Sequence, residues 1–233
     1  MVSLGHHIAV VGDCPYSKGR NQYDEGASMT PFAQSEFEAR SLAGLAMPQS
    51  RMARIVSVMA LAIVGSLLLT LSAKIQVPFY PVPMTLQTFA LMAIVAAFGL
   101  RAGVATVLLY LAEGAAGLPV FTGTPEKGIG LAYMAGPTGG YLAGFVVAAL
   151  IVGFAVERGW GSNPFKLFAA MVVADAALFA LGLLWLGTLI GWDKPVFALG
   201  AAPFILGDLV KIALAAALIP ALWSLVRRIA SIR

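Results

Sequence analysis

The fold class follows from the stretch 53-ARIVSVMALAIVGSLLLTLSA-73, in which Arg54 is the only charged residue. The hydrocarbon core of a bilayer is about 30 Å thick, so a helix needs about 20 apolar residues to cross it. Five further stretches have a similar apolar character, at about residues 84–100, 102–118, 139–157, 165–190 and 200–225. The sequence therefore predicts an all-α membrane protein, a bundle of six transmembrane helices within residues 51–233.

The composition excludes several functional classes. Of the 233 residues, 60% are hydrophobic and 11% are charged, whereas a soluble domain carries about 25% charged residues. The net charge of +4 comes without a basic stripe interleaved with aromatic residues, so no nucleic-acid partner is expected. Cys14, His6 and His7 all precede the first apolar stretch, so we expect no cofactor, metal site or histidine-based catalytic centre in the membrane part.

Residues 1–50 differ from the rest of the chain. They mix polar and apolar residues without a sustained period, which predicts a disordered cytoplasmic extension. An equally open interpretation is a misplaced start, with Met47 or Met52 as the true first residue.

The distribution of basic residues predicts the orientation in the membrane. With the N-terminus inside, the outer side holds three basic residues of the membrane part, Lys74, Lys127 and Lys194. The cytoplasmic side then holds eight: Arg51, Arg54, Arg101, Arg158, Lys166, Arg227, Arg228 and Arg233. Because basic residues concentrate in cytoplasmic loops, both termini are predicted to be cytoplasmic in a multi-pass protein of the inner membrane.

Two connections are predicted to lie on the outer side. Residues 74–83 contain three prolines, which rule out a continuous helix, and residues 119–138 are rich in glycine. Long loops on one face indicate a lid or a binding site on that face.

Charged residues inside membrane spans are candidates for function because burying them is costly. Asp208 and Lys211 are three residues apart and share one helix face. They form either a neutral ion pair that holds helices together or the polar floor of a ligand site, which we favour because other polar residues are expected at the same depth. These are Thr85, Gln87, Tyr110 and Tyr141.

Two further carboxylates and two glycines have competing interpretations. Asp175 either reaches the same cavity or only bonds a neighbouring helix, and Glu113 is expected to extend to water. Gly140 and Gly144 have the spacing typical of close helix packing. The chain lacks a phosphate-binding loop of the ATPase type, so it is not expected to hydrolyse ATP alone.

Four motifs resemble those of the BioY family, the biotin-binding substrate components of energy-coupling-factor transporters. They are Pro81-Val-Pro-Met-Thr-Leu-Gln-Thr88, Leu109-Tyr-Leu-Ala-Glu-Gly-Ala-Ala-Gly-Leu-Pro-Val-Phe121, Gly136-Pro-Thr-Gly-Gly-Tyr-Leu-Ala-Gly-Phe145 and Gly207-Asp-Leu-Val-Lys-Ile212. The resemblance covers about residues 53–225.

The resemblance implies six helices, outward-facing biotin capture, and docking on a transmembrane coupling protein that carries two ABC-type ATPases. It also implies that Asp208 and Lys211 bind the ligand. Members of that family dock on the coupling protein through small residues on their first helix, and the nearest match to that spacing here is Ala62 with Ser66. The segment Thr124-Pro-Glu-Lys127 departs from the plain glycine-rich run of that family's third loop.

The chemistry of biotin fits these residues in two poses. Asp208 would accept ureido N–H bonds, and Lys211 would donate to either the ureido oxygen or the carboxylate. Phe79, Tyr80, Phe121 and Tyr141 are candidates for apolar walls. Three alternatives remain open: a stand-alone secondary carrier driven by protons, an intramembrane aspartyl protease using Asp175 with Asp208, and the same scaffold tuned for another vitamin.

Overall fold

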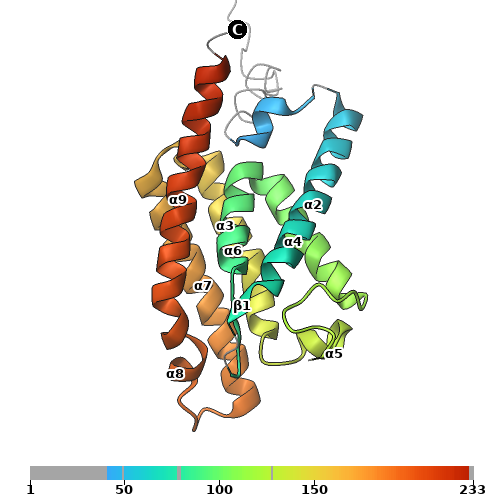
Figure 1. Ribbon diagram of the computed structural model, residues 1–233, viewed down its shortest axis with the longest axis vertical. Helices are drawn as coiled ribbons and strands as arrows, with labels where there is room; N and C mark the ends of the chain where they lie inside the picture. The colour runs from blue at the N-terminus through green and yellow to red at the C-terminus, as the bar shows by residue number, and fades with distance from the viewer. Residues whose placement is uncertain (1–40, 49, 78–79, 127, 231–233) are drawn as a thin grey trace, which may run out of the picture.

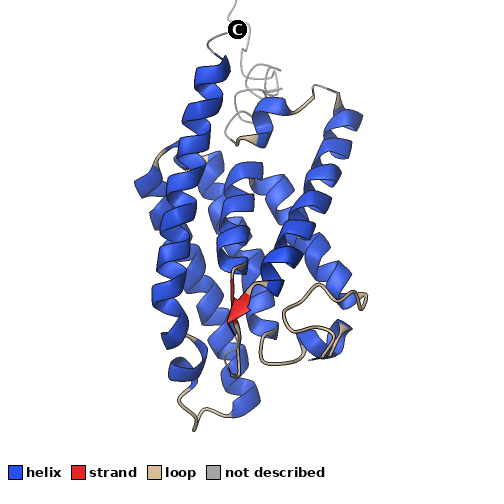
Figure 2. Cartoon of the chain, viewed as in Figure 1, coloured by secondary structure: helices blue, strands red, loops and turns tan. Residues whose placement is uncertain are grey.

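The computed structural model describes residues 41–48, 50–77, 80–126 and 128–230. Within these ranges the protein is mostly helical (Figures 1 and 2). The six longer helices are α2 (Arg51–Lys74), α3 (Gln87–Phe98), α4 (Leu100–Ala115), α6 (Gly139–Glu157), α7 (Pro164–Ile190) and α9 (Ala202–Ala230). The shorter elements are η1 (Ala43–Ala46), β1 (Gln76–Val77), β2 (Met84–Thr85), α5 (Gly130–Met134), η2 (Trp160–Ser162) and α8 (Val196–Gly200).

Four of the described helices are long and apolar enough to cross a membrane. They are α2, α6, α7 and the Ala202–Val226 part of α9. The remaining two of the six main helices do not reach this length, since α3 has 12 residues and α4 has 16. At 1.5 Å per residue these two rise about 18 and 24 Å, less than the thickness of the hydrocarbon core.

Local chemistry accounts for where the helices begin. The Ser50 hydroxyl accepts a hydrogen bond from the Ala53 amide at 3.2 Å and caps α2. Asn163 caps α7 in the same way, with Pro164 at the first helical position. The predicted start of the second span at residue 84 is wrong, because Met84 and Thr85 pair antiparallel with Val77 and Gln76 instead.

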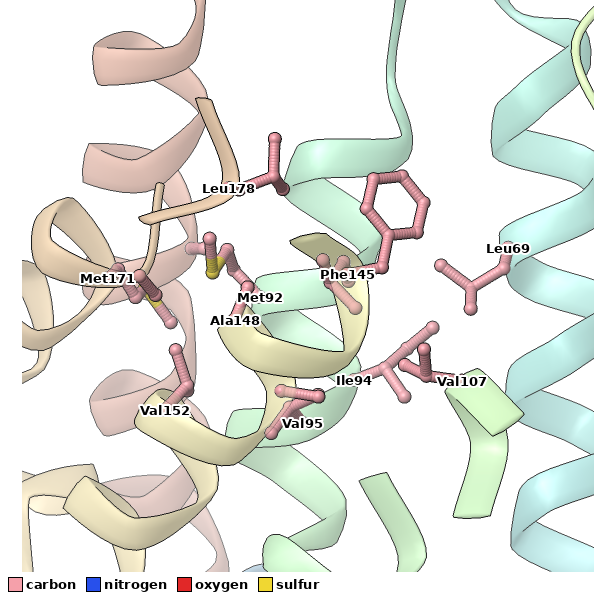
Figure 3. Close-up of a cluster of buried hydrophobic side chains, with 14 of the residues drawn as sticks. Leu69, Met92, Ile94, Val95, Val107, Phe145, Ala148, Val152, Met171 and Leu178 are labelled. Atoms are coloured by element: carbon pink, nitrogen blue, oxygen red, sulfur yellow. The ribbon is translucent and has the colours of Figure 1, made fainter. Parts of the chain in front are cut away.

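The bundle is centred on α6, which packs most extensively on α7 and also contacts α3 and α4. The predicted role of Gly140 and Gly144 in close packing is confirmed. A Cβ at Gly140 would lie 2.3 Å from the Cβ of Trp185, and one at Gly144 would lie 2.9 Å from the Cα of Leu178. Figure 3 shows part of the core, where side chains from α2, α3, α4, α6 and α7 meet.

The folded part of the chain extends before residue 51. Ser41 is buried, its hydroxyl accepts a hydrogen bond from the Gly44 amide at 3.1 Å, and η1 contacts α3. The remainder of the predicted extension, residues 1–40, lies outside the described residues.

The irregular connections gather at one end of the bundle. β1, α5 and α8 lie opposite the C-terminal end of α9 (Figure 1). The glycine-rich connection 119–138 includes the short helix α5, and residues of this connection and of β2 line the same cavity.

Candidate functional site

A cavity lies between α3, α4, α6, α7 and α9, with an empty volume of about 610 Å³ that includes the space open at its mouth. Seven of the eight predicted binding residues line it: Thr85, Gln87, Tyr110, Phe121, Tyr141, Asp208 and Lys211. The structure thus brings together side chains that are up to 126 positions apart in the chain, as the contact of Lys211 with Thr85 illustrates.

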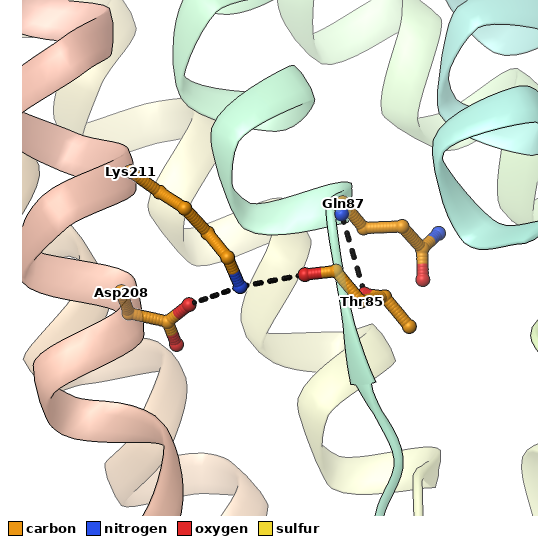
Figure 4. A network of polar contacts seen from close by, with 4 residues as sticks. All are labelled: Thr85, Gln87, Asp208 and Lys211. Carbon is orange, nitrogen blue, oxygen red and sulfur yellow. Dashed lines mark hydrogen bonds and ion pairs between the residues drawn. The ribbon is translucent and has the colours of Figure 1, made fainter. Parts of the chain in front are cut away.

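The charged pair of α9 forms one side of the cavity. The Lys211 ammonium donates to Asp208 Oδ1 at 2.8 Å and to the backbone carbonyl oxygen of Thr85 at 2.6 Å (Figure 4). The two side chains are only 15% and 7% exposed. Because an ammonium group carries three N–H donors, Lys211 keeps one more for a ligand after making both bonds.

Asp208 also has capacity for a ligand. One carboxylate oxygen accepts from Lys211, and Thr88 of α3 lies near the same side chain. An ionised carboxylate has about four lone-pair sites, so further N–H donors can be accommodated at this wall.

A second polar group is built around the amide of Gln87, the first residue of α3. Its nitrogen donates to the Tyr110 hydroxyl at 2.8 Å, and its oxygen accepts from the Thr122 hydroxyl at 3.2 Å. Tyr110 in turn donates to the Val120 carbonyl at 3.3 Å. Since both ends of the amide are bonded, its orientation is fixed before a ligand arrives.

Aromatic rings supply the apolar surface on the side of the connection 119–138. Phe121 stacks on Tyr133 with ring centroids 5.0 Å apart and meets Tyr110 edge-on at 5.4 Å. The Tyr133 hydroxyl donates to the Thr122 carbonyl at 2.8 Å. Burial raises the pKa of Tyr133 above its ordinary value, so this hydroxyl stays protonated and remains a donor.

A second aromatic group is formed by residues of α6, α7 and α9. Tyr141 meets Phe179 edge-on at 6.2 Å, and Phe179 stacks on Phe204 at 6.4 Å. The Tyr141 hydroxyl donates to the Gly200 carbonyl at 2.8 Å, which ties α6 to the short helix α8. The cavity is therefore lined by two groups of aromatic rings together with polar groups.

Asp175 of α7 lies near the charged pair of α9. It does not line the cavity, yet it is within the electrostatic reach of Asp208 and Lys211. The side chain is 8% exposed, and its Oδ1 atom has no hydrogen-bond partner among the described residues. A buried acceptor of this kind is costly to leave unsatisfied, so Asp175 is available to a water molecule, a proton or a ligand group.

The structure places three other sequence-predicted residues away from the cavity. Glu113 accepts a hydrogen bond from the Ser66 hydroxyl of α2 and is partly exposed, so its extension to water stays a prediction. Ala62 and Ser66 are 2% and 1% exposed. This pair is therefore covered within the chain, and partner docking through it stays a prediction.

Of the other two predicted aromatic walls, one lies away from the cavity and one lies outside the described residues. Tyr80 is 91% exposed and does not line it, and Phe79 lies outside the described residues. Tyr133 and Phe204 line the cavity, and both escaped the sequence analysis. The position of Phe204 carried a signal, because it lies four residues before Asp208 and hence on the same face of the helix.

No metal centre is visible in the described part of the chain. No group of three or more His, Cys, Asp or Glu side chains there is arranged to hold a metal ion. The cavity is instead suited to a small organic ligand with polar and apolar parts, because such sites combine apolar walls with a few placed polar groups.

Comparison with known proteins points to one family. A sequence model described as the BioY family matches residues 43–228. The probable biotin transporter BioY of Pyrococcus horikoshii is 36% identical over 148 residues, which cover 64% of this chain and 85% of that protein. The biotin transporter BioY of Thermotoga maritima is 35% identical over 150 residues, with 64% and 85% covered.

A solved structure has a similar fold. It is the crystal structure at 2.1 Å of the S-component for biotin from an ECF-type ABC transporter. The TM-score is 0.63 at 23% sequence identity, and the match covers 73% of this chain and 93% of that one. At this identity the likeness shows a shared fold.

Proposed function

The chain belongs to the BioY family, and from that premise we propose that it is the biotin-binding membrane component of an energy-coupling-factor transporter. The observation that carries the proposal is the cavity, which is lined by the Asp208–Lys211 pair, the Gln87 amide and two groups of aromatic rings. Biotin is an amphiphilic ligand of the same kind, with a polar ureido ring, an apolar ring and chain, and a carboxylate.

The polar groups of the cavity complement those of biotin in type. The Asp208 carboxylate accepts the ureido N–H groups, and the free N–H of Lys211 donates to either the ureido oxygen or the ligand carboxylate. Hydrogen bonds that involve a charged partner are the strong ones. Asp175 does not line the cavity but lies within electrostatic reach of the pair, and its unpartnered oxygen can accept from a water molecule that links it to the ligand.

The aromatic rings match the apolar part of the ligand. Phe121 and Tyr133 in one group and Phe179 and Phe204 in the other provide flat surfaces for the fused ring and the alkyl chain. The tight packing of Phe121 against Tyr110 fixes this surface in advance, which reduces the entropy cost of binding.

The proposed topology has six spans, with both termini in the cytoplasm and the cavity opening outward from the inner membrane. In this proposal α3 and α4 are the two spans that join α2, α6, α7 and α9, because each of them packs against α6 within the bundle. Two structural features support this orientation: the β1–β2 hairpin, α5 and α8 lie at one end, and α2 begins at the other end with Arg51 and Arg54 (Figure 1). Basic residues at that end agree with a cytoplasmic side.

Energy for uptake comes from partner subunits in this proposal. The sequence carries no phosphate-binding loop of the Walker type. A transmembrane coupling protein and ABC-type ATPases would therefore drive transport, while this chain supplies the specific biotin site within the lipid bilayer.

Calorimetry of the purified protein tests the proposal directly. Titration with biotin, riboflavin and thiamine should give tight one-to-one binding for biotin alone. Reconstitution into vesicles with ATP inside and out should show biotin binding without ATP hydrolysis. Binding of another vitamin in preference to biotin, or ATP hydrolysis by the isolated chain, would overturn the assignment.

A further inference from the structure

Lys74, the last residue of α2, makes a concentrated set of contacts with the connection 119–138. Its ammonium donates to the backbone carbonyl oxygens of Pro119 at 2.8 Å, Phe121 at 3.0 Å and Thr124 at 3.3 Å. It also contacts the Thr124 hydroxyl at 3.2 Å. Four oxygens of one short turn therefore converge on a single ammonium group from another part of the chain.

This arrangement differs from that of an ordinary surface lysine. Lys194, on the connection between α7 and α8, pairs only with the exposed carboxylate of its neighbour Asp193 at 3.5 Å. Such exposed ion pairs contribute little to stability. The oxygens around Lys74 belong to backbone carbonyls and one hydroxyl, so the ammonium organises the path of the chain rather than neutralising a charge.

The turn that Lys74 holds is also part of the ligand cavity. Phe121 and Thr122 line the cavity, and both side chains are buried. The turn is closed on itself as well, because the Thr124 hydroxyl donates to the Phe121 carbonyl at 2.6 Å. Phe121 fills the space above Gly114, where a Cβ would come within 2.0 Å of its ring. A shift of this turn would therefore move the aromatic wall and the Thr122 contact to Gln87 together.

We propose that Lys74 is a positioning residue for the biotin site, a cationic clamp that holds the turn 119–124 and its aromatic wall in the binding-competent position. The clamp acts through the turn and does not touch the ligand, since Lys74 does not line the cavity. The inference rests on the proposed biotin site. If the wall is in place one-tenth of the time without the clamp, the apparent Kd rises about tenfold, because affinity scales with the competent fraction.

The test compares three variants of the full-length protein. Lys74→Met removes the ammonium at similar length, Lys74→Arg keeps a cation with several donors, and Lys194→Met removes a lysine from another connection at the same end. Calorimetry and ligand-release kinetics give Kd and dissociation rate, and hydrogen exchange without biotin reports on the amides of residues 120–124. We expect Lys74→Met to raise Kd about tenfold, to speed release and to accelerate exchange in this turn. Lys74→Arg should retain most of the affinity, and Lys194→Met should behave as wild type.

Two results would overturn the clamp. One is wild-type affinity and exchange in Lys74→Met. The other is a lower melting temperature with an unchanged Kd for the folded fraction, which would make Lys74 a merely structural residue. Failure of the wild-type protein to bind biotin would instead reject the proposed function, and the exchange rates would still decide whether Lys74 holds the turn.

Discussion

Removing either member of the Asp208–Lys211 pair should abolish high-affinity biotin binding while the protein still inserts. The substitutions Asp208→Asn and Lys211→Met each remove one charge and keep nearly the same side-chain size. The two groups are 2.8 Å apart and 7% and 15% exposed, so each is the main partner of the other in the free protein. In the bound protein each would also contact biotin.

The magnitude follows from the burial of the pair. Losing one partner of a buried, hydrogen-bonded charge pair at a binding interface costs about 2–5 kcal/mol. At about 1.4 kcal/mol for each tenfold change in affinity, this corresponds to a loss of roughly 30-fold to several thousand-fold. Lys211→Met also removes the bond to the Thr85 carbonyl, so it should lie toward the upper end of this range.

The double variant Asp208→Asn/Lys211→Met separates a binding role from a structural one. If the pair only neutralises itself, the double variant should be more stable than either single variant, because no lone charge remains buried. If the pair binds biotin, the double variant should rescue nothing. The assay is calorimetry on protein that elutes as a single species, with melting curves recorded for all four proteins.

Biotin methyl ester then distinguishes the two poses. If Lys211 serves the ureido oxygen, the wild-type protein should tolerate the ester, and Lys211→Met should weaken binding of acid and ester alike. If Lys211 serves the ligand carboxylate, the ester should already bind poorly and the substitution should add little. A double variant that binds biotin as the wild type does would refute both poses.

Three further predictions concern packing, the buried acceptor and topology. Gly140→Leu should destabilise the protein by about 2 kcal/mol or more, because a Cβ there lies 2.3 Å from that of Trp185; an unchanged melting temperature would contradict this packing. Asp175→Asn should preserve folding and weaken biotin binding about tenfold, the value of one hydrogen bond; unchanged affinity on calorimetry would restrict Asp175 to helix packing. A cysteine at Tyr80, which is 91% exposed, should react with an impermeant thiol reagent on intact cells when Cys14 is replaced by serine; labelling only from the cytoplasmic side would overturn the proposed topology.

The helices were predictable from the sequence because burial in a bilayer requires long apolar runs. The span predicted at 139–157 coincides with α6, and the one at 165–190 differs from α7 by one residue. The pairing of Asp208 with Lys211 was predictable for a similar reason, since helical geometry alone puts residues three apart on one face. These features depend on local periodicity and not on long-range contacts.

The aromatic walls were less predictable, because they depend on how irregular connections fold back. Phe121 was foreseen, yet its stacking on Tyr133 requires the turn at 119–124 and the short helix α5. Lys74 was interpreted only as a charge that marks the outer side. Its contacts with backbone carbonyls leave no trace in the sequence, because any residue supplies a carbonyl oxygen.

The start of α3 shows how an error in the predicted helix connects to the site. A helix that began at residue 84 would commit the Thr85 carbonyl to the amide four residues later in the helix. In the structure Thr85 lies in β2, so its carbonyl is free to accept from Lys211 at 2.6 Å. Irregular backbone at membrane depth is tolerated where it lines a cavity and finds partners. The late start of α3 thus leaves room for the cavity. It also fixes the position of Lys211, because Thr85, which precedes the helix, supplies the carbonyl oxygen that accepts from the lysine.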